Sequence, residues 1–104
     1  MEQNGYCERL LLALVKEYLD LSRDTRRQGV NDKDVVVRAG IASRSQVEGA
    51  EWTQLYRNEI RPALTQLYVD GFIIVSRLGT TGIWLSRVQP TKAAIMYFRL
   101  RERH

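Results

Sequence analysis

The stretch LYVDGFIIVSRLGTTGIWLSRVQPT, residues 67–91, decides how this chain folds. It begins with apolar residues at helical spacing and then reaches Gly71, which can end a helix because glycine adopts a left-handed backbone without strain. The segments FIIVSRL and GIWLSRV are rich in β-branched and aromatic residues and flank GTTG, a pattern typical of a β-hairpin. A proline follows, and then Thr91, a candidate helix N-cap. We therefore predict a helix, a hairpin and a last helix in that order.

A hairpin symmetric about its central Thr-Thr pair also predicts how the strands align. This register pairs Leu78 with Ile83, Arg77 with Trp84, Val75 with Ser86 and Ile73 with Val88. One face of the hairpin then carries the aliphatic residues near its base. Arg77 would lie against Trp84 near the tip, where a cation–π contact is possible.

Residues 3–22 are predicted to form the first helix, which is unusually apolar. One stripe holds Cys7, Leu11, Leu14, Tyr18 and Leu21, and Leu12, Val15 and Leu19 widen it. A surface helix of a monomer needs a narrower stripe. The helix is therefore either central in the domain or shared with a partner, and in so short a chain we favour the partner.

The middle of the chain is less regular. SRDTRRQGV, ending at residue 30, is predicted to be a loop. Asn31 or Asp32 can cap a short helix that ends at Gly40. Its inward-facing residues would be Val35, Val36 and Ala39. The polar residues 41–57 allow no firm assignment.

A second amphipathic helix leads into the opening stretch, with apolar residues at Ile60, Leu64, Leu67 and Tyr68. Pro62 lacks a backbone N–H, so we place a helix start or a kink between about residues 56 and 59. The last helix, residues 91–103, carries one apolar stripe with Met96 and Leu100, and a second with Ala94, Ile95 and Phe98.

Composition limits the class of protein. A chain of 104 residues with 44% hydrophobic residues predicts a single domain, residues 1–104. A single cysteine, no apolar run long enough for a membrane span and no signal-peptide pattern predict a cytoplasmic protein without a membrane partner.

Catalytic and metal-binding patterns are lacking in the sequence. The only histidine is His104 at the C-terminus, and there is no phosphate-binding glycine loop or paired-cysteine motif. The carboxylates of Asp32, Asp34, Glu48, Glu51 and Glu59 are interpreted as solvated or placed at helix N-termini. We expect no enzyme activity, no metal and no cofactor.

Positive charge is concentrated at one end of the chain. The formal net charge is +4, and residues 72–104 carry six lysines and arginines against Glu102 alone. A polyanion would be attracted to this part first, because phosphate binding releases counterions.

The order helix, short helix, helix, hairpin, helix resembles the winged helix-turn-helix superfamily. The segment EIRPALTQLYVDGFIIVSRLGTTGIWLSRVQPTKAA is similar to the part of MarR-like and PadR-like DNA-binding proteins where the recognition helix joins the wing. Leu67, Gly71 and Phe72 match that join, and Thr91 matches the cap of the following helix. The resemblance implies an α+β, mostly helical fold with three helices, a two-stranded β-hairpin wing and a C-terminal helix. The family has only a short turn where this chain has about fifteen residues, so either an extra helical turn is present or the recognition helix starts earlier and bends at Pro62.

Such a fold would read DNA with the helix face opposite the apolar stripe. Asn and Gln can read adenine, and Arg can read guanine or bind phosphate. The candidate DNA-binding residues of the recognition helix are Arg57, Asn58, Arg61, Thr65 and Gln66. Those of the wing are Arg77, Thr80, Thr81 and Arg87. Further candidates are Lys33, Arg38, Ser43 and Arg44.

The resemblance also implies a homodimer formed by the first and last helices. The candidate interface residues are Leu12, Leu19, Phe98 and Ile95. The alternative is that these helices wrap one core within a monomer.

The sequence thus favours a small homodimeric transcriptional regulator that binds double-stranded DNA. Two alternatives remain open. One is a winged-helix module that holds a protein partner, and the other is a DNA-binding accessory factor of replication or recombination.

Overall fold

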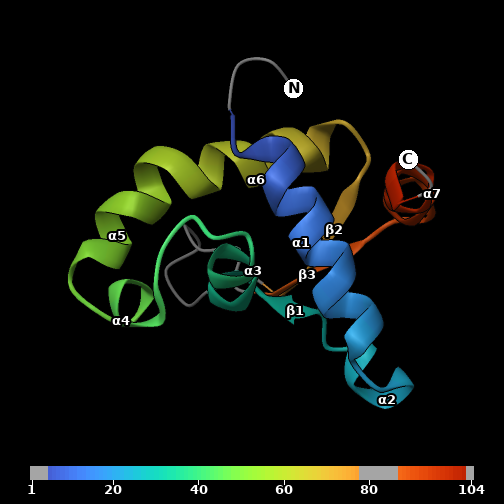
Figure 1. Ribbon diagram of the computed structural model, residues 1–104, viewed down its shortest axis with the longest axis horizontal. Coiled ribbons are helices and arrows are strands. Elements are labelled where there is room, and N and C mark those ends of the chain that lie inside the picture. The colour runs from blue at the N-terminus through green and yellow to red at the C-terminus, as the bar shows by residue number, and fades with distance from the viewer. Residues whose placement is uncertain (1–4, 78–86, 103–104) are drawn as a thin grey trace.

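The computed structural model describes residues 5–77 and 87–102, and of Ser76 and Arg77 it describes the backbone. The described part is α+β and mostly helical, with a small antiparallel sheet (Figure 1). The elements are α1 (Cys7–Asp20), α2 (Arg23–Arg26), β1 (Val30–Asn31), α3 (Asp32–Arg38), α4 (Arg44–Val47), α5 (Glu51–Leu55), the π-helical turn η1 (Tyr56–Ile60), α6 (Arg61–Val69), β2 (Ile73–Arg77), β3 (Arg87–Pro90) and α7 (Lys92–Glu102). No helix within these ranges combines the length and apolar character needed to cross a bilayer.

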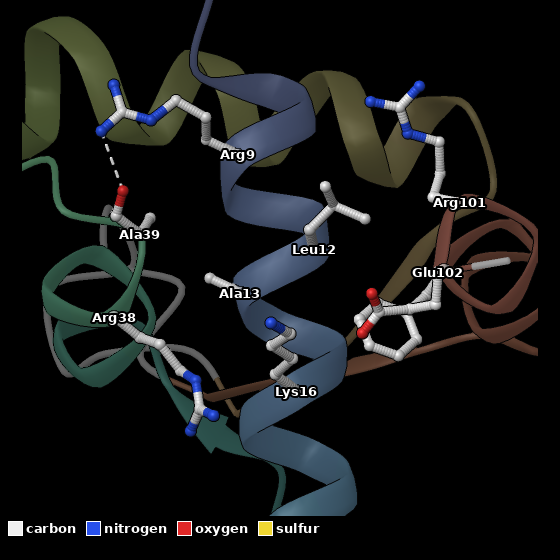
Figure 2. A pocket seen from close by; sticks show the side chains of 9 residues that line it. Arg9, Leu12, Ala13, Lys16, Arg38, Ala39, Arg101 and Glu102 are labelled. Carbon is white, nitrogen blue, oxygen red and sulfur yellow. Dashed lines mark hydrogen bonds between the residues drawn. The ribbon is translucent and has the colours of Figure 1, made fainter. Parts of the chain in front are cut away.

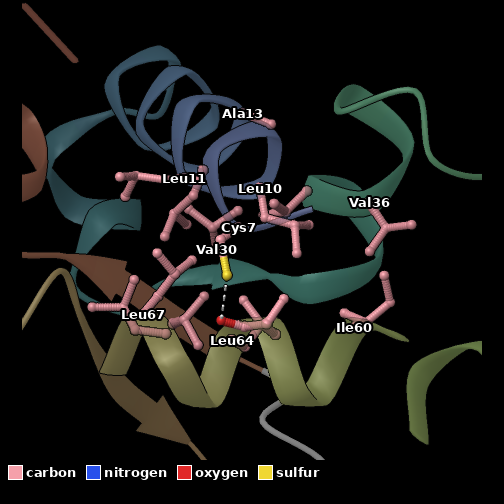
Figure 3. Packing of buried hydrophobic residues seen from close by; sticks show 14 of the residues in the cluster. Cys7, Leu10, Leu11, Ala13, Val30, Val36, Ile60, Leu64 and Leu67 are labelled. Atoms are coloured by element: carbon pink, nitrogen blue, oxygen red, sulfur yellow. Dashed lines mark hydrogen bonds between the residues drawn. The ribbon is translucent and has the colours of Figure 1, made fainter. Parts of the chain in front are cut away.

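Helix α1 is the centre of the domain. It packs against α3, α6, α7, β1 and β3. Its buried residues are Cys7, Leu10, Leu11, Ala13, Leu14 and Val15. Figure 3 shows this face of α1 against α6, where the Cys7 thiol lies 3.7 Å from the carbonyl oxygen of Ala63. Each fully buried aliphatic side chain of this kind stabilises the fold by roughly 1.5–3 kcal/mol. The wide apolar surface of α1 thus serves mainly the core of its own chain, whereas the sequence favoured a surface shared with a partner.

Helix α3 begins at a side-chain cap. The Asn31 carboxamide oxygen accepts a hydrogen bond from the Lys33 backbone N–H at 2.9 Å, so Asn31 rather than Asp32 is the capping residue. Val35 and Val36 are buried as predicted, whereas Ala39 is half-buried. Gly40 follows the helix with φ +73°, as expected for a glycine that ends a helix.

The segment without a firm sequence assignment is largely helical. Ser43 caps α4 in a capping box, because its hydroxyl accepts from the Gln46 N–H while the Gln46 side chain accepts from the Ser43 N–H. Helix α5 then begins at Glu51 and continues through η1 into α6. Both possibilities raised for this region therefore hold: an extra helical turn is present and the long helix starts early. Of the helix start or kink predicted between about residues 56 and 59, the start is not found, because the long helical run begins at Glu51. The π-helical turn η1 is an irregularity at the predicted position of the kink.

Pro62 gives a physical reason for the π-helical turn. Proline has no N–H to donate, and its ring clashes with the carbonyl four residues earlier in a regular α-helix. The Arg61 N–H donates to the Tyr56 carbonyl, five residues back, which widens the helix just before the proline. The helix therefore bends and continues where a break would be expected.

The sheet has three strands, in the order β1-β3-β2, where the sequence predicted two. The segment predicted to be a loop contains the short helix α2 and the start of β1. β1 pairs Val30 with Val88 and Asn31 with Arg87. A two-residue strand is too short to show alternation, so only its pairing with β3 reveals it.

The predicted hairpin register is wrong, by two residues at Ile73 and Val75 and by three at Arg77. Ile73 pairs with Pro90 and Val75 with Val88, and an irregularity follows before the pairing of Arg77 with Arg87. The irregularity adds a residue to β2, which a hairpin symmetric about its tip does not include. A shift of two preserves the inward side of each strand, so Val88 is still buried. The other predicted partners, residues 78 and 83–86, lie outside the described residues.

The join between α6 and the sheet is as predicted. Gly71 has φ +83°, the Phe72 N–H donates to the Leu67 carbonyl, and the Gly71 N–H donates to the Tyr68 carbonyl. These two hydrogen bonds form a Schellman motif. The Thr91 hydroxyl donates to the Gly71 carbonyl at 2.7 Å and also caps α7 by accepting from the Ala94 N–H. One threonine thus ties the end of α6 to the start of α7.

We expect Gly71→Ala to lower the free energy of unfolding by about 1–2 kcal/mol, because a β-carbon is strained in the left-handed region. Nothing lies within 4 Å of the added carbon, so the loss would report backbone strain alone. Gly71→Asn should lose less, because asparagine tolerates this conformation better. Urea denaturation measures both variants. Gly5→Ala, where the added carbon also meets nothing, is the control, and an equal loss in that control contradicts the assignment.

Candidate nucleic-acid interface

The outer face of the α5–η1–α6 run is the candidate base-reading surface. Ile60, Leu64 and Leu67 are buried against the core, which fixes the opposite side outward. Of the predicted recognition residues, Arg57, Asn58, Thr65 and Gln66 are exposed and Arg61 is half-buried. The structure therefore brings all five onto one helical run that lies along an edge of the molecule (Figure 1).

The π-helical turn divides these residues into two groups. Arg57 and Asn58 lie in η1, and Arg61, Thr65 and Gln66 lie in α6. A π-helical turn contains more residues per turn than an α-helix. The residues in η1 are therefore rotated about the helix axis relative to those in α6, compared with a continuous α-helix. Sequence spacing at 3.6 residues per turn therefore does not give the true face of Arg57 and Asn58.

Six arginines elsewhere in the described chain are held by internal contacts, whereas the exposed side chains of Arg23, Arg27 and Arg99 are not. Arg38 binds Glu17 and Asp20 at 2.9 and 2.8 Å, and Arg44 binds Asp34 at 2.9 Å. Backbone carbonyls accept from the guanidinium groups of Arg9, Arg26 and Arg87, and the Glu8 carboxylate accepts from Arg101. Arg57 and Arg61 also have no hydrogen-bond or carboxylate partner among the described residues, and both lie on the long helical run. Their charges are available for an external anion.

One group of the Gln66 side chain already has a partner within the protein. Its side-chain amide donates to the Asp70 carboxylate at 2.9 Å, across one turn of α6. This contact orients the amide nitrogen toward the end of the helix and leaves the carbonyl oxygen as the group available to a ligand. Asp70 also places a negative charge at this end of the surface. Glu59 is exposed in η1 as well, so the half of the surface that contains Arg57 and Arg61 carries two positive charges and one negative charge.

The further candidates lie near α3 and α4. Ser43 caps α4, and Lys33 extends over the ring of Trp52, with its nitrogen 5.8 Å from the ring centroid. The ion pair of Arg44 with Asp34 lies at the α3–α4 junction. The two carboxylates of α1 turn Arg38 toward α1, so the structure does not bring it together with the α6 face.

Little of the predicted wing surface falls within the described residues. Thr80 and Thr81 lie outside them, as does the side chain of Arg77. Arg87 is half-buried in β3, and its guanidinium donates to the Gly29 carbonyl at 3.4 Å. This contact fixes Arg87 beside β1, where it helps hold the sheet together.

The predicted interface residues belong partly to the core. Phe98 is only 8% exposed within a single chain. Leu12, Leu19 and Ile95 are half-buried and pack against the core cluster. The large apolar side chains that α7 leaves exposed are Met96 and Leu100, at 65% and 56%.

A buried carboxyl beneath η1 is the feature that sequence reasoning missed. Asp32 is 5% exposed, and its carboxyl is hydrogen-bonded to the side chain of Tyr56, which is itself buried. Tyr56 packs on Trp52 with ring centroids 5.2 Å apart. Asp32 does lie in the first turn of a helix, as expected, but the sequence gives no sign that the long helix covers it.

Burial raises the pKa of Asp32 to about 7, against the opposing effects of the backbone N–H of Lys33, the Tyr56 hydroxyl and the Lys33 charge. No cluster of three or more histidine, cysteine or acidic side chains in the described ranges could hold a metal ion. Asp32 is thus an isolated buried acid at the base of the candidate surface.

Comparisons of the chain with protein-family models, with curated proteins and with solved structures found no match.

We expect the stability of the fold to fall as the pH rises from about 4 to 7. The folded chain keeps the Asp32 proton in this range, whereas the unfolded chain, with a pKa near 3.8, has lost it. The contribution is therefore fully present below pH 4 and is lost above pH 7, by an amount on the order of a few kcal/mol. Asp32→Asn should remove this part of the pH dependence while keeping an acceptor for Tyr56.

Urea denaturation at pH 5 and pH 8 measures the effect. Asp34→Asn is the matched control, because Asp34 lies two residues away in the same helix and is partly exposed. An equal pH dependence in the wild-type chain and Asp32→Asn contradicts the assignment to Asp32.

Proposed function

We propose that this chain is a small homodimeric winged-helix transcriptional regulator that binds double-stranded DNA sequence-specifically. The observation that carries the proposal is the pair of uncommitted arginines, Arg57 and Arg61, on the outer face of a long helix whose inner face is buried. Asn58 and Thr65 on the same run supply the hydrogen-bonding groups that read base edges.

Shape and charge support this proposal. An exposed helix fits the major groove, where each base pair presents a distinct pattern of donors and acceptors. The helix is connected through the Schellman motif at Gly71 directly to the sheet. The strongest positive excess of the chain follows that join, in residues 72–104. A duplex held against α6 would therefore meet base-reading groups on the helix. Of the positive side chains after the join, Arg87 and Arg101 are held by internal contacts, whereas Lys92 and Arg99 are exposed.

The homodimer is proposed from the exposed apolar residues of α7. Met96 and Leu100 are one helical turn apart and point away from the buried Ala94 and Phe98. An isologous dimer buries the same patch on both subunits. It would also present two α6 helices to DNA half-sites about 34 Å apart.

We expect Arg57→Ala and Arg61→Ala each to weaken binding to duplex DNA by about tenfold, because each removes a positive charge at the surface. The salt dependence of log affinity should also fall by about one unit of slope. Fluorescence anisotropy with a labelled duplex, at two salt concentrations, measures both effects. A selection from random duplexes first supplies the target sequence.

Arg23→Ala is the matched control, because Arg23 is an exposed arginine of α2 with no contact in the described structure. Its affinity should match that of the wild type. Wild-type affinity that does not fall as salt rises would rule out the proposal. Equal losses in all three arginine variants would rule out the α6 surface as the DNA-binding face.

Met96→Glu combined with Leu100→Glu should raise the dimer dissociation constant at least tenfold, because charges would be buried in the interface. Sedimentation equilibrium measures it. Gln28→Glu, an exposed position on the loop before β1, is the control and should leave the dimer intact. A wild-type chain that stays monomeric at 100 µM, a concentration on the order of a weak-complex dissociation constant, contradicts the dimer.

A further inference from the structure

A cleft of about 530 Å³ lies over the outer face of α1, on the side away from α6 (Figure 2). Its walls are the end of α3 and the last turns of α7. Its lining residues are Arg9, Leu12, Ala13, Lys16, Arg38, Ala39, Phe98, Arg101 and Glu102. This volume lies within the range of small-molecule sites in proteins, about 300–1,000 Å³. The proposed DNA-binding face does not use it.

The floor of the cleft is apolar. Leu12 and Ala13 lie along α1. Phe98 of α7 also lines the cleft. Ala13 and Phe98 are nearly buried, whereas Leu12 is half-buried and points into the opening. A ligand with an apolar body would remove this surface from water, which stabilises binding.

Two of the four positive groups of the cleft are already neutralised. Arg38 is held by Glu17 and Asp20. Arg101 is held by Glu8, which also accepts a hydrogen bond from Tyr97. These ion pairs fix the walls of the cleft and contribute little to its attraction for an anion.

The other two positive groups, Arg9 and Lys16, have no carboxylate partner among the described residues. One guanidinium nitrogen of Arg9 donates to the Ala39 carbonyl at 2.8 Å, which holds the group at the α3 wall and leaves its other N–H groups unused. Lys16 lies two turns further along the same face of α1, about 10.5 Å along the helix axis. Arg9 points toward Ala39 in Figure 2, so one anionic group over Leu12 and Ala13 contacts both side chains only when they turn toward it.

Glu102 places a negative charge on one side of the cleft. It stands on the α7 wall, with its carboxylate pointing toward the part of α1 that carries Ala13 and Lys16, and it has no hydrogen-bond or cationic partner in the described part of the chain. A second anionic group of a ligand would be repelled there, whereas a hydroxyl or an amine would be accepted. Another copy of α7 is a poor occupant, since its Lys92, Arg99 and Arg101 would add positive charge to this cleft.

We propose that the cleft binds a small organic anion, with its carboxylate or phosphate between Arg9 and Lys16 and its apolar body over Leu12 and Phe98. This site is separate from the proposed DNA-binding face, so neither depends on the other. A bound ligand would bridge α1, α3 and α7, three elements that meet around the core.

Isothermal titration calorimetry with the wild-type chain tests the proposal, using hexanoate, phenyl phosphate, inorganic phosphate and hexan-1-ol as probes. Hexanoate or phenyl phosphate should bind saturably, and hexan-1-ol and inorganic phosphate each at least tenfold more weakly. The two anionic probes distinguish a carboxylate site from a phosphate site. Inorganic phosphate binding as tightly as phenyl phosphate, or hexan-1-ol as tightly as hexanoate, would overturn the proposal, as would no saturable binding of either organic anion.

Variants locate the site. Lys16→Gln and Arg9→Gln should each lower the affinity for the tightest-binding organic anion by about tenfold. Arg23→Gln, on α2, should leave that affinity unchanged. Lys16 is exposed and makes no contact in the described structure, so its loss leaves the fold intact, as circular dichroism can verify. Wild-type affinity in Lys16→Gln, or an equal loss in Arg23→Gln, contradicts the placement of the anion.

Discussion

The burial of one face of α1 is the constraint on which the rest of the structure depends. Cys7, Leu10, Leu11 and Leu14 are each 1% exposed or less, and they meet α3, α6 and the sheet at once. A short helix whose neighbours lie on several sides must be apolar around much of its circumference. Packing on this face sets the inner side of α6, and the outer side of α6 is then turned toward solvent.

The arginines that remain available to a ligand are those that have no partner within the fold. Across the described chain, most arginines bind a carboxylate or a backbone carbonyl, and these contacts join α1 to α3 and α7, and β3 to the segment before β1. Arg57 and Arg61 are left uncommitted on the long helix, and Arg9 and Lys16 lack carboxylate partners in the cleft over α1. The net charge of the chain is therefore a weaker guide to where an anion binds than the set of positive side chains that have no partner within the protein.

Local signals in the sequence predicted some elements well. The Schellman end at Gly71 and the cap at Thr91 were visible because both depend on residues close in sequence. The strand register and β1 were not visible, because a bulge and a two-residue strand are defined only by their pairing. The site was predicted in part: the candidate residues of the long helix are on one run, but Arg38 is turned toward α1, and the buried Asp32 was taken for an ordinary first-turn carboxylate.

The sequence by itself determined an α+β, mostly helical domain, the helix ends at Gly40, Gly71 and Thr91, and the apolar faces, since these follow from short-range backbone preferences and from the spacing of side chains. The tertiary structure decided which of those groups remain available. It buried Asp32 under Tyr56, moved the long helix through a π-helical turn before Pro62, and paired Arg38 and Arg101 with carboxylates of α1. Burial and charge pairing arise between segments far apart in the chain, so no local pattern contains them.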